Sequence, residues 1–268
     1  MGTESVASLG SFIERVQEIR DAWAVPDYKE LWFRGEKRDY GDSRLRPALY
    51  RPPKDRSRRL KPVTELLEIE RDLFERFLNS SEQLVERPPE DEFDGYILMQ
   101  HHDAPTRLLD WSDGSLMALH FALRGKLGDP RDPVVYMLEP ERLIDTLEAL
   151  PDWHPNEEWP VDDESIAYLP NKPEDLELPR VPMLLTFRQM SRRVAAQHSQ
   201  LLVFGTDPAW LSKQLSEADP PIEAITIDGQ KTREMRAQLR ECGVSESVIF
   251  PDLDGLGREL RQLWQDRQ

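Results

Sequence analysis

The chain has 268 residues and a formal net charge of −16. This acidic excess argues against broad binding of nucleic acid, because nucleic-acid phosphates require Lys and Arg. The single cysteine, Cys242, excludes an internal disulfide and predicts a reducing, cytoplasmic location. We expect no membrane span, since no window approaches the 18 or so consecutive apolar residues that one requires.

The spacing of apolar residues predicts the secondary structure of the first half of the chain. Helices are predicted over 5–24, 64–79, 91–102 and 116–123, and extended segments at 31–33, 108–109 and 134–138. Ser11 and Glu14 are candidates for a capping box at the start of the first helix. Residues 40–63 are rich in Pro and Arg and are expected to be irregular.

In the second half, helices are predicted over 140–150, 208–215, 230–242 and 253–265, and extended segments at 183–188, 200–204, 224–227 and 248–250. Residues 151–182 are Pro-rich and acidic and are predicted to form a long surface excursion. Gly243 fits the left-handed position after a helix, and Asp254 is the predicted N-cap of the last helix.

Together these elements predict an α+β fold in one domain over 1–268, because no flexible linker separates two cores. We expect a mixed central sheet with flanking helices. The motifs discussed below fall within residues 30–260.

Residues 99–124 place many polar side chains inside apolar sequence: Gln100, His101, His102, Thr106, Arg107 and Asp110. Removing an unpartnered polar group from water costs roughly 2–7 kcal/mol. These groups therefore satisfy one another or bind a ligand. The adjacent His101 and His102 point in different directions, so we expect no metal site there.

Several residues admit both a functional and a structural interpretation. Arg34 suits a pyrophosphate and Gly35 permits close approach of a ligand, but Arg34 is also able to pair with Asp110 or a carbonyl. Arg107 and Asp110 are candidates for a buried ion pair. Trp111 belongs in the core or stacks on a base, and Ser112 caps a helix or contacts the ligand.

Three separated motifs resemble one family: WFRGE at 32–36, MQHHDAPTRLLDWSDGSLMALHFAL at 99–123 and VIFPDLDGLGREL at 248–260. They are similar to the FRG domain, a bacterial family named for its Phe-Arg-Gly motif. RPALYR at 46–51 and RVAAQ at 193–197 resemble two further segments of that family. The resemblance implies a toxin or phage-defence setting.

A more distant similarity is to ADP-ribosyltransferases of the Arg-Ser-Glu type, which implies an ADP-ribosyltransferase-like fold and NAD as the cofactor. It implies that Arg34 holds the NAD phosphates and that Asp110-Trp111-Ser112 shapes the nicotinamide end. Gln197 stands where such enzymes carry their catalytic Glu, so the sequence departs from the pattern there.

We therefore expect Arg34, Gly35, His101, Arg107, Trp111 and Ser112 to contact NAD or another nucleotide. The expected catalytic residues are Gln197, Glu36 and Asp110, with Glu36 as a substitute base. The expected activity is transfer of ADP-ribose to a protein acceptor, or cleavage of NAD. The alternatives are a non-catalytic module that senses a nucleotide or binds a protein, and a hydrolase that uses Asp110 and a His as acid and base.

Overall fold

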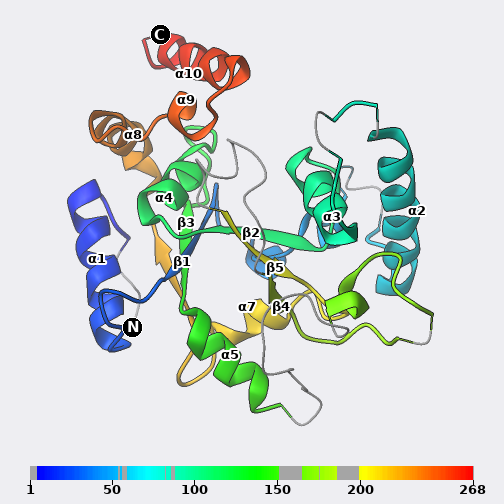
Figure 1. The fold of residues 1–268 in the computed structure, drawn as a ribbon. Coiled ribbons are helices and arrows are strands. Elements are labelled where there is room, and N and C mark those ends of the chain that lie inside the picture. The colour runs from blue at the N-terminus through cyan, green and yellow to red at the C-terminus, as the bar shows by residue number, and fades with distance from the viewer. Residues whose placement is uncertain are drawn as a thin grey trace.

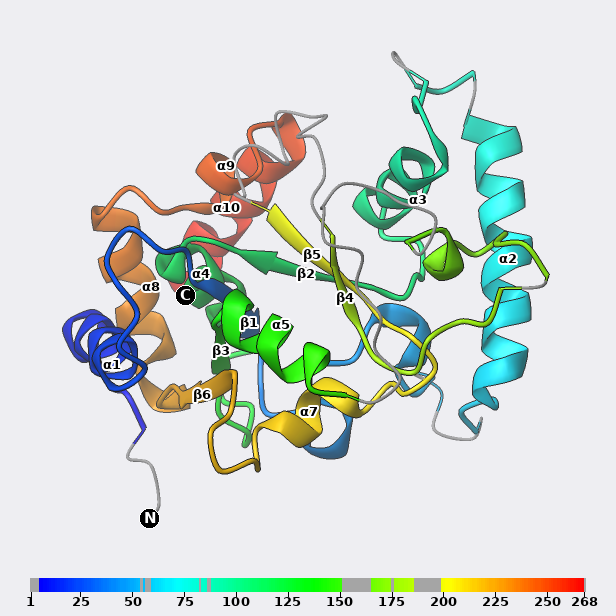
Figure 2. The same ribbon diagram turned by 60° about the horizontal axis from the view of Figure 1, so that its bottom comes forward.

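A six-stranded antiparallel sheet lies at the centre of the structure, with helices on both faces (Figures 1 and 2). The computed structural model describes residues 5–53, 55, 59–81, 83–85, 88–150, 165–174, 176–185 and 199–267. The strands are β1 (Trp32–Glu36), β2 (Leu108–Ser112), β3 (Val134–Leu138), β4 (Met183–Leu185), β5 (Ser199–Val203) and β6 (Ile222–Thr226). Their order across the sheet is β4-β5-β2-β1-β3-β6.

The predicted α+β class is confirmed, but the predicted mixture of strand directions is wrong. Every neighbouring pair of these six strands is antiparallel. A connection between neighbouring parallel strands usually contains a helix. Here β2 and β3, β3 and β4, and β5 and β6 each run in the same direction, but the two members of each pair are not neighbours in the sheet. The parallel contact among the described residues is an isolated bridge between Val6 and Ile227.

Nine α-helices lie in the described residues: α1 (Leu9–Ala22), α2 (Val63–Ser81), α3 (Glu92–His101), α4 (Ser115–Leu123), α5 (Pro140–Glu148), α7 (Trp210–Gln214), α8 (Thr232–Glu241), α9 (Glu246–Ile249) and α10 (Leu253–Asp266). Four 3-10 turns accompany them: η1 (Gly41–Ser43), η2 (Ala48–Tyr50), η3 (Ser165–Tyr168) and η4 (Gly229–Lys231). No helix in the described ranges has both the length and the apolar character that crossing a membrane requires.

Three local predictions are corrected at helix ends. The capping box of α1 joins Ser8 and Ser11 rather than Ser11 and Glu14. Residues 248–250 are not an extended segment, because α9 occupies most of them; a helix of one turn is too short to show a helical period. Asp252, not Asp254, caps α10 by accepting a hydrogen bond from the Gly255 amide at 2.6 Å.

One face of the sheet is covered by α5, α7 and η2. The buried side chains of this core include Trp32, Leu109, Trp111, Tyr136, Leu143 and Leu211. Because side chains alternate along a strand, Arg34 and Glu36 of β1 belong to the same face as Trp32.

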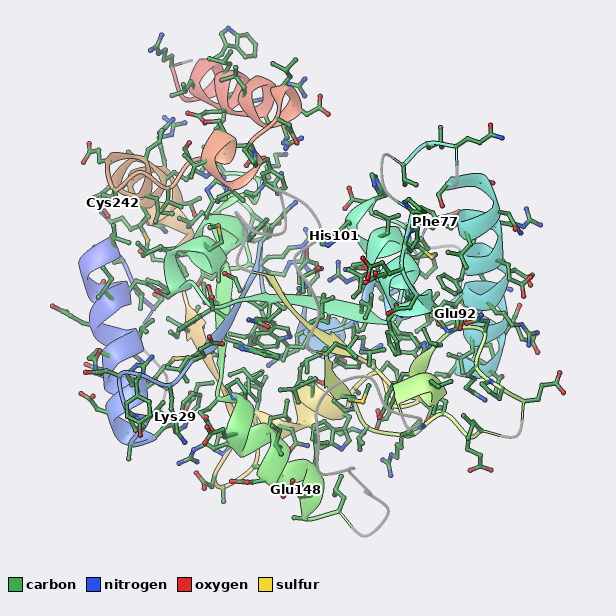
Figure 3. The ribbon with its side chains drawn as sticks, in the orientation of Figure 1. Lys29, Phe77, Glu92, His101, Glu148 and Cys242 are labelled. Carbon is green, nitrogen blue, oxygen red and sulfur yellow. The ribbon has the colours of Figure 1, made fainter. Side chains whose placement is uncertain are left out.

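The opposite face carries two separate cores. Helices α1, α4 and α8 cover β1, β3 and β6, whereas α2 and α3 cover β2, β4 and β5. Figure 1 shows these two groups of helices at opposite ends of the sheet, and Figure 3 places Phe77 of α2 on the side that faces α3. Asp110, in the middle of β2, is the exposed residue in that strand. The arrangement leaves its carboxylate open to solvent between the two cores.

Gly35 fixes how closely α4 approaches β1. A Cβ atom built on Gly35 would lie 1.9 Å from the carbonyl oxygen of Ala118 and 2.5 Å from the amide nitrogen of Ala122. A side chain larger than hydrogen therefore requires the helix or the strand to move.

The predicted surface excursion over 151–182 is only partly described, since residues 151–164 and 175 lie outside the described ranges. Within the described part, Ala167, Tyr168 and Leu169 are buried in the core that α2 and α3 cover. Pro173, Glu174, Glu177 and Arg180 are exposed, so the described part lies partly in the core and partly at the surface.

Candidate functional site

Arg34 lies where β1 and β2 separate. The two strands are paired only at Phe33 and Ser112. Beyond that pair, Arg34 Nη1 donates a hydrogen bond of 2.6 Å to the carbonyl oxygen of Asp110. The alternative in which Arg34 pairs with a carbonyl is thus confirmed, and 13% of its side chain remains exposed.

Glu36 is the carboxylate nearest to this guanidinium. Its Oε1 lies 3.7 Å from Arg34 Nε and accepts a hydrogen bond from the Leu45 amide at 3.1 Å. The residue is buried. Burial raises the pKa of Glu36, and this effect exceeds the opposing effects of Arg34, of the Leu45 amide and of Arg51.

Asp110 is held by a chain of polar side chains from α3 and the start of β2. Gln100 Nε2 donates to Asp110 Oδ2 at 2.6 Å, and the Thr106 hydroxyl donates to Gln100 Oε1. The Leu108 amide in turn donates to Thr106 Oγ1 at 3.2 Å. The polar residues of the central block therefore partly satisfy one another, and they fix the direction of the Asp110 carboxylate.

Arg51 adds a second guanidinium near this cluster, and sequence reasoning did not include it among the candidates. It follows η2, which is held by a hydrogen bond of 3.1 Å from the Leu49 amide to the Thr106 carbonyl. Arg51 is exposed, but partial desolvation of its guanidinium lowers its pKa, and the positive charge of Arg34 lowers it further. Arg51 is the last residue of the RPALYR segment, and this position is the feature of the sequence that could have marked it as a candidate.

Arg107 is a predicted site residue, but its guanidinium is buried in the protein interior. Its side chain is 1% exposed. Its Nε donates to Glu70 Oε2 at 2.6 Å, while Nη1 and Nη2 donate to the carbonyls of Phe204 and Tyr168 at 3.0 and 2.6 Å. The predicted ion pair of Arg107 with Asp110 is wrong, because Arg107 pairs with Glu70 of α2.

Three further predicted residues lie near β2. Trp111 is buried in the core under α5 and α7, and its Nε1 has no hydrogen-bond partner in the described part of the chain. Ser112 Oγ accepts from the Gly114 amide at 3.1 Å. This bond shapes the turn before α4, whose N-cap is Gly114. His101 ends α3, and Figure 3 labels it near the centre of the molecule.

The sheet brings the predicted motifs together. Phe33 of β1 lies opposite Ser112 of β2, and Ser112 lies opposite Ser199 of β5. Arg34 and Gly35 follow Phe33, and Asp110 and Trp111 precede Ser112, so all these residues lie on adjacent strands. Gln197 lies outside the described residues, two positions before Ser199.

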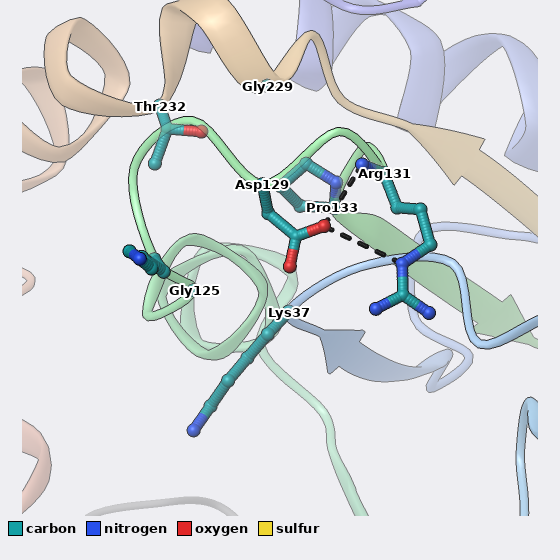
Figure 4. Close-up of a pocket in the computed structure, with 8 residues that line it drawn as sticks. Lys37, Gly125, Asp129, Arg131, Pro133, Gly229 and Thr232 are labelled. Carbon is teal, nitrogen blue, oxygen red and sulfur yellow. Dashed lines mark hydrogen bonds and ion pairs between the residues drawn. The ribbon is translucent and has the colours of Figure 1, made fainter.

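A small surface pocket lies elsewhere (Figure 4). Its lining comprises Lys37, Gly125, Lys126, Asp129, Arg131, Pro133, Gly229 and Thr232. None of the predicted site residues lines it. The Asp129 carboxylate already accepts a hydrogen bond from the Arg131 amide and lies 3.6 Å from its guanidinium, so these two residues satisfy each other.

Residues 29–130 match the family model of the FRG domain. No curated protein and no solved structure matched the chain. The matched range includes WFRGE, RPALYR and the central block, so the chain contains an FRG domain. The motifs at 193–197 and 248–260 lie beyond that range, and their part in the resemblance stays a prediction.

Proposed function

We propose that this FRG-domain chain binds NAD or a related nucleotide where β1, β2 and β5 meet, on an ADP-ribosyltransferase-like fold. The observation that carries the proposal is the alignment of Phe33, Ser112 and Ser199 across three neighbouring strands. The resemblance requires the Arg motif, the Ser motif and the segment before β5 to converge, although they are far apart in the sequence.

Arg34 would hold the phosphates. A guanidinium has five N–H donors, and one of them is used on the Asp110 carbonyl. Its Nε is buried and has no hydrogen-bond partner among the described residues. The charges of Arg34 and Arg51 both act on Glu36, and those of Asp39 and Asp110 act at the same place. A bound phosphate would accept hydrogen bonds from the remaining Arg34 donors.

The other proposed roles follow from position. The exposed Asp110 carboxylate, oriented by Gln100, would accept hydrogen bonds from ribose hydroxyls. Its neighbours Trp111 and Ser112 are buried, so they would shape the nicotinamide end by holding β2 and the following turn in place. Glu36 would act as the base, a role that its raised pKa supports because it increases its affinity for a proton. Transfer would break the bond between nicotinamide and ribose and pass ADP-ribose to a protein acceptor or to water.

The test is titration of the purified chain with NAD and with ADP-ribose, followed by thermal unfolding and calorimetry. Because hydrogen bonds to charged groups contribute about 1.5–3 kcal/mol, Arg34→Gln should weaken binding about 10- to 100-fold. The control is Arg15→Gln, since Arg15 pairs with Glu18 on the surface of α1, and it should bind like the wild type. Absence of stabilisation at millimolar NAD would contradict the proposal.

A binding module without turnover is the second candidate, and the neutral Gln197 favours it because the catalytic position lacks a carboxylate. Release of nicotinamide from labelled NAD decides between the two: release indicates an enzyme, and binding without release indicates a sensor. The Asp–His hydrolase is not proposed, because the side chain that holds Asp110 is the Gln100 amide and His120 pairs with Glu246.

A further inference from the structure

Helix α10 presents a row of apolar side chains on its outer face. Leu253, Leu256, Leu260 and Trp264 are 86%, 44%, 57% and 59% exposed. Their spacing of three and four residues places them along one side of the helix. We call these four residues the α10 stripe. Figure 1 shows α10 at the outer end of the molecule, beside α9 and away from the sheet. A contiguous exposed apolar patch of this kind marks an interaction surface.

The opposite side of α10 is fixed to the protein. A Cβ atom on Gly255 would lie 2.0 Å from the Phe250 carbonyl oxygen, so the helix is pressed against that segment. Arg258 Nε donates to Glu246 Oε1 at 2.7 Å, and Glu259 accepts from Ser245 and the Ser247 amide, each at 2.8 Å. These contacts set the rotation of the helix, and the α10 stripe therefore stays outside.

We propose that the α10 stripe is the interface of a homodimer in which α10 packs antiparallel against α10 of a second copy. A two-fold axis that passes between Gly257 and Leu260 would place Leu253 of one copy against Trp264 of the other. It would also place Gly257 against Leu260 of the second copy. An interface between identical surfaces of this kind is closed and self-complementary.

Gly257 supplies the space for this packing. It is exposed, and no atom lies within 4 Å of the position that its Cβ would occupy. Because the glycine lies four residues after Leu253 and three before Leu260, it falls within the α10 stripe. It leaves a hollow in the middle of the stripe for a leucine of the facing helix.

Charge complementarity identifies the occupant as a second copy. Asp254 and Arg261 are seven residues apart, so they lie on the same flank of the α10 stripe. In an antiparallel pair each flank faces itself, and Asp254 of each copy would meet Arg261 of the other. Neither side chain has a hydrogen bond or an ion pair to another residue that the structure describes.

Sedimentation velocity and light scattering of the full chain at about 1–100 µM test the proposal, a range that brackets a micromolar Kd. The wild type should form a dimer, and Leu260→Glu should be monomeric with an unchanged circular dichroism spectrum. Ile13→Glu is the matched control, because Ile13 is also apolar and 50% exposed but lies on α1; it should remain dimeric. A monomeric wild type, or a dimer that survives Leu260→Glu, would overturn the proposal.

A charge exchange tests the antiparallel arrangement. Asp254→Arg and Arg261→Asp should each weaken the dimer about 3- to 10-fold. Each variant places like charges at positions 254 and 261 of facing copies, and the two-fold axis makes this contact occur twice. The double variant should regain wild-type affinity. Failure of the double variant to regain it would overturn the assignment of these flanks to each other.

Discussion

Arg107 has the largest side chain among the fully buried residues. The carboxylate of Glu70 receives its guanidinium and also its backbone amide, the latter at 2.8 Å, and the Tyr96 hydroxyl donates to the same carboxylate. Burial lowers the pKa of Arg107, but the charge and hydrogen bond of Glu70, together with Tyr96 and Tyr50, outweigh it and raise the pKa. The pair joins α2, α3 and β2, so its contribution is to position the start of the strand that carries Asp110.

Removal of one partner should be strongly destabilising. Arg107→Met leaves the buried Glu70 charge uncompensated, so we expect a loss of about 3–5 kcal/mol in the free energy of unfolding. Urea denaturation measures it. Arg15→Met, at an exposed ion pair, should cost less than about 1 kcal/mol. A loss at Arg107 as small as at Arg15 would contradict the structural role.

At the scale of elements, Glu246 ties the C-terminal helices to the sheet. It begins α9 and contacts His120 Nε2 on α4 and Nη2 of Arg124, the C-cap of α4, both at 3.0 Å, as well as Arg258 on α10. Burial raises the pKa of Glu246, but the hydrogen bonds from His120 and Arg258 and the charge of Arg124 outweigh it and lower the pKa to about 2. This carboxylate therefore stabilises the fold in its ionised form.

The depressed pKa predicts where acid weakens the protein. The stabilisation is fully present above the unfolded pKa of about 4.5 and is lost as the pH falls toward the folded value of about 2. Glu246→Gln should lower the free energy of unfolding by about 2–3 kcal/mol at pH 6, and the difference should shrink below pH 4.

Urea titrations of both proteins at several pH values measure this difference. Glu18→Gln, at an exposed ion pair of α1, should show no such dependence on pH. A constant gap between Glu246→Gln and the wild type from pH 6 to pH 2.5 would contradict the assignment.

The sequence predicted several elements with bounds close to those of the structure. The strand Val134–Leu138 has the predicted bounds, and α3 differs from its prediction by one residue at each end. Gly243 adopts the predicted left-handed conformation, with φ of 83°. The one-turn helix α9 was missed because four residues define no period.

Prediction of the site was limited by contacts between distant residues. The interpretation in which Arg34 pairs with Asp110 or a carbonyl is confirmed, because Arg34 donates to the Asp110 carbonyl. The partner of Arg107 was not found, because Glu70 lies 37 residues earlier on the polar side of a helical pattern. No local signal distinguishes a buried glutamate in such a pattern from a solvated one.

At the scale of the whole molecule, the net charge of −16 opposes compaction by self-repulsion. Raising the ionic strength from about 0.01 to 0.15 M shortens the screening length from about 30 to 8 Å. The free energy of unfolding should then rise by on the order of 1 kcal/mol. Thermal or urea unfolding in NaCl measures it. The salt effect should vanish near the pI of about 4.8, and a decrease with salt at pH 7 would contradict the prediction.

The contact between Gly35 and α4 has a consequence for how this sequence can vary. Because no methyl group fits between that glycine and Ala118, strand and helix touch backbone to backbone and neither slides along the other. This contact also fixes the position of the Arg34 guanidinium, which donates to the Asp110 carbonyl. An alanine at position 35 would thus displace the charge at position 34 while leaving its chemistry intact. Gly35 thus determines which position the Arg34 guanidinium can occupy.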